Sequence, residues 1–130
     1  MRVRIVSLLV SGCFLYALGI STAQAQDAAE GKQLYVSYCS TCHGETGKGD
    51  GMVGRSLPVK PADHTNGTIM NPLSDQFLHD IIAKGGSAVG KSSFMPSWGS
   101  SLDEKQIRDL VAYLRSIADP PYKRAKPAPK

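Results

Sequence analysis

Two segments of the chain carry apolar side chains at the spacing of an amphipathic helix, three or four residues apart. In residues 28–38 this face consists of Gly31, Leu34, Tyr35 and Tyr38. In residues 75–84 it consists of Phe77, Leu78, Ile81 and Ile82. Ser74 is the expected N-cap of this second helix, and Gly85 is expected to end it. The pattern therefore predicts two helices of about three turns each.

A third helix is predicted closer to the C-terminus. Its apolar face consists of Ile107, Leu110, Val111 and Leu114. The sequence Ser101-Leu102-Asp103-Glu104 fits a capping box with Ser101 as N-cap, and Asp119-Pro120-Pro121 is expected to end the helix. Between the helices, residues 44–54 contain five glycines, and residues 57–71 and 85–99 show no clear periodicity and no convincing strand. We therefore predict an all-α fold with long loops.

The first 25 residues have the pattern of a secretory signal peptide. Arginines at positions 2 and 4 precede an uncharged apolar stretch over residues 5–20, and Ala23-Gln24-Ala25 follows as a signal-peptidase motif. We expect cleavage after Ala25 and export to an oxidising compartment, the bacterial periplasm. Two alternatives stay open. One is an uncleaved anchor, although the stretch is shorter than the roughly 20 residues of a spanning helix, and the other is a lipoprotein processed at Cys13.

Apolar residues make up 42% of the whole chain, and their share would be lower in the mature chain that remains after removal of this leader. A chain of about 100 residues with long loops buries a modest fraction of its surface and is marginal without additional stabilisation. The two cysteines that remain, Cys39 and Cys42, are too close together to link distant segments. We therefore expect a bound group to fill the centre of the fold.

The stretch Cys39-Ser40-Thr41-Cys42-His43 is C-x-x-C-H, the attachment sequence of haem c. Two thiols three residues apart on a helical turn can each add to one vinyl group of the haem, and the following imidazole can then bind the iron. This chemistry makes Cys39 and Cys42 the covalent anchors and His43 an axial ligand. A cysteine pair also occurs in thioredoxin-like redox sites, which need a strand before the helix, and in zinc sites, which here would need His64 or His79.

We predict that Met95 is the second axial ligand of the iron. It lies in the extended segment Phe94-Met95-Pro96-Ser97-Trp98, far enough along the chain from His43 to reach the opposite face of the haem. The aromatic residues on either side can wall the ring, and the proline stiffens the backbone. The other side chains that could serve are Met52, Met70, His64 and His79.

We do not expect any of these four residues to bind the iron. Met52 is only nine residues past His43 and is interpreted as a loop methionine, whereas Met70 is expected to pack against the haem. His79 falls outside the apolar stripe of its helix and is expected at the surface. His64 lies between two polar residues and is expected to be solvated. An open sixth position of the iron is the remaining alternative.

The chain resembles the class I c-type cytochromes, small single-haem electron carriers, over nearly all of the part after the leader. The matching residues are Gly31, Tyr35, the stretch Cys39–Gly44, Met95, Pro96, Leu110 and Tyr113. The resemblance implies a cytochrome c fold, with three to four helices around one covalently bound haem c. It also implies that the first and last helices cross at these small and aromatic residues. Met52 stands where many relatives carry proline, so Pro58 or another backbone group would have to accept the hydrogen bond of His43. We expect the glycines of residues 44–54 to allow backbone to approach the porphyrin edge.

The net charge of +4 and the pI of about 9.1 invite a nucleic-acid-binding interpretation. Two of the positive charges belong to the leader and four to residues 123–130, which contain no acid, so the body between them is slightly acidic. Nucleic-acid binders carry a basic patch on the folded body. The charge distribution therefore argues against a nucleic-acid partner.

We divide the chain into a signal peptide over residues 1–25, a cytochrome c domain over residues 26–122 and a flexible basic tail over residues 123–130. With His43 and Met95 both bound, the iron has no vacant position, which predicts a one-electron carrier and not an enzyme. We expect a periplasmic monomer that exchanges electrons with redox proteins and is not inserted in the membrane after cleavage. The alternatives are a membrane-tethered or lipoprotein subunit of an oxidase or dehydrogenase complex, and a small haem enzyme with an open sixth site.

Overall fold

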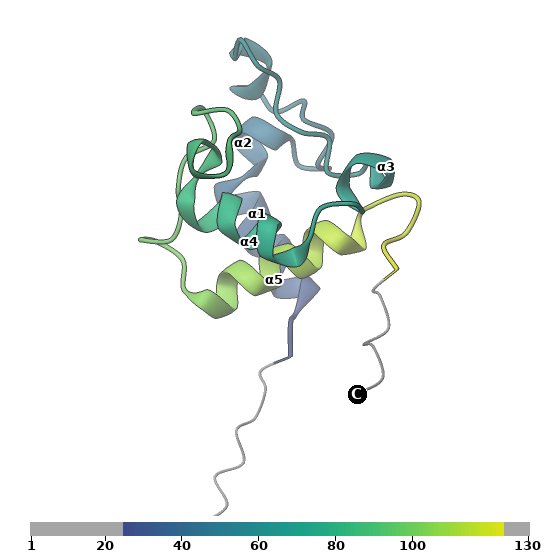
Figure 1. The fold of residues 1–130 in the computed structure, drawn as a ribbon. Coiled ribbons are helices and arrows are strands. Elements are labelled where there is room, and N and C mark those ends of the chain that lie inside the picture. The colour runs from purple at the N-terminus through teal and green to yellow at the C-terminus, as the bar shows by residue number, and fades with distance from the viewer. Residues whose placement is uncertain (1–24, 124–130) are drawn as a thin grey trace, which may run out of the picture.

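The structure is a computed structural model that describes residues 25–123. Its α-helices are α1 (Ala28–Tyr38), α2 (Ser40–His43), α3 (Gly67–Met70), α4 (Asp75–Lys84) and α5 (Glu104–Ser116). Two 3-10 helices, η1 (Gly54–Ser56) and η2 (Gly86–Val89), lie in the connections. The described residues form no strand, only an isolated bridge between Asn66 and Asp119. The predicted all-α fold with long loops is confirmed (Figure 1).

Helices α1 and α4 have the bounds that the sequence predicts, because their caps are local. The carboxylate of Asp27 accepts hydrogen bonds from two backbone N–H groups of the first turn of α1, at 2.8 and 3.3 Å. The hydroxyl of Ser74 accepts from the N–H of Phe77 at 3.0 Å and starts α4. Gly85 ends α4 with a φ of 84°, a backbone conformation that glycine adopts without strain.

Helix α5 begins two residues later than predicted, and the assignment of Ser101 as its N-cap is wrong. The carboxylate of Asp103 accepts from the N–H of Gln106 at 2.9 Å, and the Gln106 side chain accepts from the N–H of Asp103 at 2.9 Å. This reciprocal pair is the capping box of α5. The N–H of Ser101 instead donates to the carbonyl oxygen of Trp98 at 2.9 Å, in the turn before the helix.

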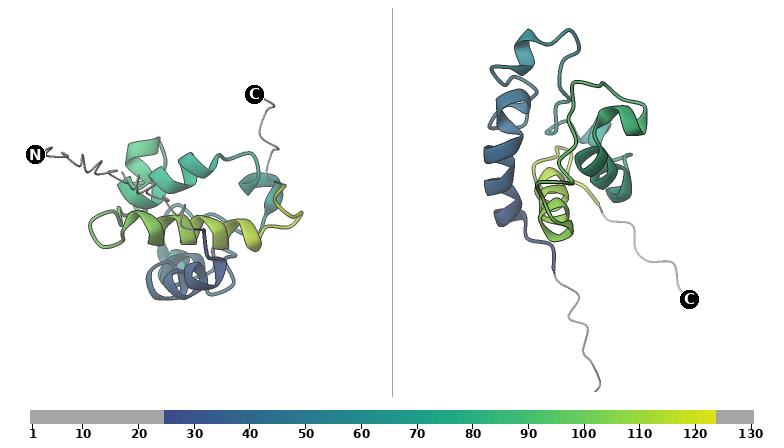
Figure 2. Two further views of the ribbon diagram at one scale, coloured as in Figure 1. Left: turned by 90° about the horizontal axis from the view of Figure 1, so that it is seen from below. Right: turned by 90° about the vertical axis from the view of Figure 1, so that its left-hand side faces the viewer.

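Helix α5 lies between α1 and α4, as Figures 1 and 2 show from three directions. It crosses α1 so closely that Gly31 has no room for a side chain, since a Cβ there would lie 2.0 Å from the carbonyl oxygen of Asp109. Next to this contact the rings of Tyr35 and Tyr113 pack with their centroids 5.1 Å apart. The first and last helices, α1 and α5, therefore cross at small and aromatic residues, as the family resemblance implies.

Two buried polar side chains of α5 tie this helix to other segments. Asp109 is fully buried and accepts from the N–H of Asp27 at 2.8 Å and from Nζ of Lys105 at 2.6 Å. Arg115 is also buried, and its Nε donates to the carboxylate of Asp75 at 2.9 Å. The other guanidinium nitrogens of Arg115 donate to the carbonyl oxygens of residues 70 and 73. Helix α5 thereby anchors the start of α1 and the connection between α3 and α4.

The inner faces of α1, α4 and α5 form the hydrophobic core. Its buried side chains are Leu34, Tyr35, Met70, Leu78, Ile82, Leu102, Ile107, Leu110, Val111, Tyr113 and Leu114. Phe77 and Ile81, which belong to the apolar stripe predicted for α4, are only partly buried. Both line a cavity, which explains why the core does not cover them.

The glycine-rich residues 44–54 fold over the backbone of α2, and their expected approach to the porphyrin edge stays a prediction. The N–H of Gly51 donates to the carbonyl oxygen of Cys42 at 3.2 Å. A Cβ at Gly51 or Gly54 would lie 2.6 or 2.1 Å from that same oxygen. In the part of the chain that the structure describes, no residue of this segment lines the cavity. Glycine at these two positions therefore allows the loop backbone to pack directly against the backbone of the C-x-x-C-H segment.

Among residues 25–123, no helix has the length and apolar character needed to cross a membrane. The predicted signal peptide up to Gln24, which includes Cys13, and the tail beyond Lys123 lie outside the described residues. Cleavage after Ala25 and the division of the chain into leader, domain and tail stay predictions.

Candidate functional site

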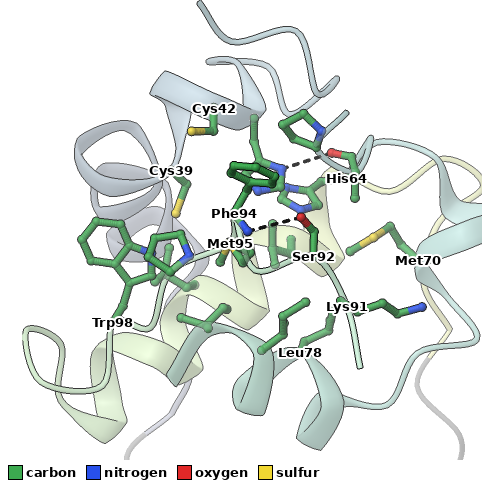
Figure 3. A pocket seen from close by; sticks show the side chains of 18 of the residues that line it. Cys39, Cys42, His64, Met70, Leu78, Lys91, Ser92, Phe94, Met95 and Trp98 are labelled. Carbon is green, nitrogen blue, oxygen red and sulfur yellow. Dashed lines mark hydrogen bonds between the residues drawn. The ribbon is translucent and has the colours of Figure 1, made fainter. Parts of the chain in front are cut away.

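A cavity of about 370 Å³ lies between α1 and α2 on one side and α4 with its following loop on the other. Apolar side chains such as Leu78 and Ile82 of α4 and Leu110 of α5 supply most of its walls. The sulfur-bearing and imidazole side chains in the lining come from several separate segments (Figure 3). They are Cys39, Cys42, His43, His64, Met70 and Met95. The fold thus brings together all the residues predicted to hold a haem.

The two cysteines lie where α1 and α2 meet. The N–H of Cys39 donates to the carbonyl oxygen of Tyr35 at 2.8 Å, and the carbonyl oxygen of Cys39 accepts from the N–H of His43 at 2.9 Å. Cys39 and Cys42 are partly buried and are not joined to each other. Burial raises the pKa of the Cys39 thiol to about 12, and the neighbouring Cys42 adds to the shift. Two unbonded thiols on one turn, at the wall of an apolar cavity, suit attachment to haem vinyl groups.

His43 is oriented by its Nδ1 atom, which lies 3.1 Å from the carbonyl oxygen of Ala62. A carbonyl oxygen only accepts, so Nδ1–H donates and Nε2 keeps a free lone pair for a metal. Burial lowers the pKa of His43, and the hydrogen bond to Ala62 opposes that shift. Both effects are compatible with a neutral imidazole ligand. The sequence left open which backbone group accepts the hydrogen bond of His43. In the structure this acceptor is the carbonyl oxygen of Ala62, and not that of Pro58.

His64 is buried, and the expectation that it is solvated is wrong. Only 9% of the residue is exposed, and its ring stacks on that of His43 with the centroids 4.2 Å apart and the planes 20° from parallel. Its Nδ1 lies 3.2 Å from the hydroxyl oxygen of Tyr35. Burial lowers the pKa of His64 to about 3, with a further decrease from His43 that Asp63 opposes. A neutral imidazole therefore covers one face of the predicted axial ligand.

The burial of His64 has a local cause that the sequence pattern hides. The carboxylate of Asp63 accepts from both the N–H and the hydroxyl of Thr65, at 2.9 and 2.6 Å. The two polar neighbours of His64 thus satisfy each other in an Asx-type turn. The N–H of His64 donates to the carbonyl oxygen of Gly47 at 2.6 Å, which fixes the turn against the glycine-rich segment. An Asp-x-Thr pattern around the histidine is the signal that could have revealed it.

Met95 lies in a loop that is fastened to the end of α4. The N–H of Gly86 donates to the carbonyl oxygen of Met95 at 2.9 Å, and the N–H of Trp98 donates to that of Ile82 at 2.9 Å. The ring of Trp98 packs edge-on against Tyr38 of α1, with 5.3 Å between the centroids. These contacts connect the loop to both sides of the cavity, and Met95 forms part of its lining.

The other residues considered as iron ligands separate into two groups. Met70 is buried and lines the cavity, as expected. Met52 is 78% exposed and lies outside the lining, which agrees with a loop methionine. His79 also lies outside the lining, and its Nε2 is 3.0 Å from the carboxylate of Glu104. Of these residues, only Met95, Met70 and His64 share the cavity with His43.

The residues of the cavity fit a haem c. Paired thiols, an imidazole with its Nε2 free and a thioether are the groups that bind haem and its iron in c-type proteins. Apolar walls with Phe94 and Trp98 nearby suit a flat hydrophobic ring. In the described residues no strand precedes the cysteine pair, and no three His, Cys, Asp or Glu side chains are grouped so that they could hold a metal ion.

Known proteins with similar sequences support this interpretation. Residues 26–114 match the family described as "Cytochrome C oxidase, cbb3-type, subunit III". The cbb3-type cytochrome c oxidase subunit FixP of Bradyrhizobium diazoefficiens is 31% identical over 76% of this chain, but the match covers only 30% of FixP. Cytochrome c6 of Nostoc sp. PCC 7120 is 26% identical, over 92% of this chain and 98% of cytochrome c6. The chain thus spans about a third of the length of the oxidase subunits that it resembles.

Solved structures show the same fold. A chain of the Kuenenia stuttgartiensis reducing HAO-like protein complex Kustc0457/Kustc0458 superposes with a TM-score of 0.61 and 28% identity, over 78% of this chain and 49% of the other. The KustC0563 c-type cytochrome superposes with a TM-score of 0.56 and 22% identity, over 68% of this chain and 98% of its own. The second likeness supports the fold alone.

Proposed function

The chain belongs to the c-type cytochrome family described as cbb3-type cytochrome c oxidase subunit III, and we propose that it is an exported monohaem member that carries single electrons between redox proteins. The observation that carries this proposal is the convergence of Cys39, Cys42, His43 and Met95 on one apolar cavity. The sequence holds a single C-x-x-C-H motif, which supports one haem per chain.

Each of these residues has a defined role in the proposal. Cys39 and Cys42 would form thioethers to the haem and fix it at the α1–α2 junction. His43 would bind the iron through Nε2, and Met95 through its sulfur. The haem, when bound, supplies one-electron exchange between ferrous and ferric iron. The protein supplies the ligands, an apolar surround and a surface on which a partner docks.

The ligand pair supports electron transfer over an enzymatic reaction. His43 and Met95 together would leave no axial position for a substrate. A thioether ligand and apolar walls such as those of Leu78 and Trp98 favour ferrous iron, because they stabilise the additional ferric charge poorly. We therefore expect a reduction potential above that of a haem with two histidine ligands.

The location and partners follow from the leader and from the relatives. The signal-peptide pattern before Gln26 supports export to the periplasm. The relatives FixP and CcoP are named as oxidase subunits, so an oxidase is one class of partner that we propose. The match to cytochrome c6 along most of both chains supports a carrier of one cytochrome domain, which we propose to be a monomer, and a subunit of an oxidase or dehydrogenase complex is the second candidate.

A pair of methionine variants tests the axial ligand. We expect Met95→Ala to remove the weak far-red sulfur-to-iron absorption of the ferric protein and to lower its reduction potential. Met70→Ala is the matched control, because Met70 is buried in the same cavity. Loss of the far-red band in Met70→Ala, with the band retained in Met95→Ala, would contradict the assignment. Rapid binding of carbon monoxide by the wild-type protein would instead favour an open site and an enzyme.

A further inference from the structure

The stacking of His64 on His43 gives His64 a place in the haem site that the attachment motif does not assign. The two rings are nearly parallel, with their planes 20° apart and their centroids separated by 4.2 Å. We propose that His64 is a positioning residue, which holds the plane of the His43 imidazole and lowers the reduction potential of the iron. This inference rests on the proposed function, since it assumes that His43 binds a haem iron.

The hydrogen bond to Ala62 alone does not fix the plane of the His43 ring. It places Nδ1 at 3.1 Å from the carbonyl oxygen, but the imidazole can still tilt about the line of that bond. A second ring in contact with the face of His43 opposes this tilt, because tilting would push one edge of the imidazole into its neighbour. The hydrogen bond acts on one edge of the His43 ring and the stack acts on its face, and together they determine its orientation.

His64 can serve as a support because it is itself held on several sides. Its Nδ1 lies 3.2 Å from the hydroxyl oxygen of Tyr35, and the two rings meet edge-on with 5.8 Å between their centroids. Tyr35 is 1% exposed and packs on Tyr113 at the crossing of α1 and α5. The backbone N–H of His64 donates a hydrogen bond to the carbonyl oxygen of Gly47 at 2.6 Å. A continuous set of contacts therefore connects the helix crossing to the predicted axial ligand.

The stack also has an electronic consequence. Oxidation of the iron draws electron density from the His43 ring and makes its face more positive. A neutral aromatic face in contact with that ring is attracted to positive charge, so the stack stabilises the ferric state more than the ferrous state. Loss of the aromatic face from His64 should therefore raise the reduction potential. The hydroxyl of Tyr35 contributes indirectly, by holding His64 in place.

The test compares His64→Leu with His64→Phe in the haem-loaded protein. Leucine removes the aromatic face, whereas phenylalanine keeps a ring at this position and loses the hydrogen bond. We expect His64→Leu to shift the ferric-to-ferrous equilibrium toward ferrous iron by about twofold to tenfold, where tenfold equals about 59 mV for one electron. His64→Phe should lie nearer to the wild type. Tyr35→Phe should give a smaller shift in the same direction as His64→Leu.

A spectroscopic readout separates positioning from a general change of polarity or stability. The pattern of hyperfine-shifted haem methyl resonances in the ferric protein depends on the plane of the axial imidazole. We expect this pattern to change in His64→Leu and to be retained in His64→Phe. His79→Leu is the control, because His79 lies outside the cavity, and it should change neither the potential nor the resonances.

The possible results distinguish failure of this inference from failure of the proposed function. Equal shifts of the potential in the leucine and phenylalanine variants would overturn the inference, because they would indicate polarity and not stacking. Unchanged potential and resonances in His64→Leu would overturn it as well. A wild-type protein that lacks covalent haem or the His43–Met95 ligand pair would overturn the proposed function before any variant is compared.

Discussion

A methyl group at Gly31 is the smallest change that tests how α1 and α5 are held together. In Gly31→Ala the new Cβ would lie 2.0 Å from the carbonyl oxygen of Asp109 and 3.0 Å from Cβ of Tyr113. Ordinary contacts begin near 3.4 Å, so the two helices would have to separate locally by roughly 1 Å. The main obstacle is backbone, which cannot relax by a change of rotamer.

The net effect is the difference between two opposing terms. Overpacking at such a contact costs about 3 kcal/mol, at the upper end of the usual range, because neither partner can move alone. Alanine in place of glycine inside a helix returns about 1 kcal/mol. The expected loss in the free energy of unfolding is therefore about 2 kcal/mol, which for a domain of roughly 100 residues lowers the Tm by about 8–16 °C.

Thermal and urea unfolding of the purified protein, followed by circular dichroism, measures this loss. Lys32→Ala is the matched control, because Lys32 is an exposed position of the same helix, and this variant should change the free energy of unfolding by no more than about 0.5 kcal/mol. Unfolding of Gly31→Ala at or above the wild-type temperature would contradict this prediction, since helix propensity would then outweigh the clash.

Three further changes test other parts of the structure. Arg115→Ala removes the donors to the half-exposed Asp75 and to two backbone carbonyls and should cost about 1.5–3 kcal/mol in urea unfolding. An unchanged midpoint would show that these hydrogen bonds contribute nothing to stability. Gly54→Ala places a Cβ 2.1 Å from the carbonyl oxygen of Cys42, and intact mass should show a smaller haem-bearing fraction than in the wild type. Deletion of residues 123–130 should change the salt dependence of electron transfer to a redox partner, and identical salt curves would dismiss a role for these four cations.

The parts of the fold that the sequence predicts are those with local causes. The bounds of α1 and α4 follow from Asp27 and Ser74, whose side chains bond to backbone N–H groups within three residues. The C-x-x-C-H motif is equally local, because its spacing is set by one helical turn. The sequence does not determine the start of α5, because Ser101 and Asp103 each precede a suitable partner by three residues, and only the turn at Trp98 decides between them.

The parts that were not predicted depend on contacts between distant segments. The acceptor for His43 is the backbone oxygen of Ala62, and residue type carries no information about which carbonyl points toward a ring. His64 was expected in solvent because its neighbours are polar, yet those neighbours bond to each other and the ring packs against α1. The one-turn helix α3 has too few residues to show a period, so sequence spacing could not reveal it.

The intact mass and the absorption spectrum of the exported protein, taken together, test the central claim most directly. We predict a mature protein that starts at Gln26 and carries one haem that survives denaturation, with Cys39 and Cys42 both consumed. We also predict the far-red band of a methionine-ligated haem in the ferric spectrum. A mass without haem, a haem released by denaturation, or a ferric spectrum without that band would contradict the account.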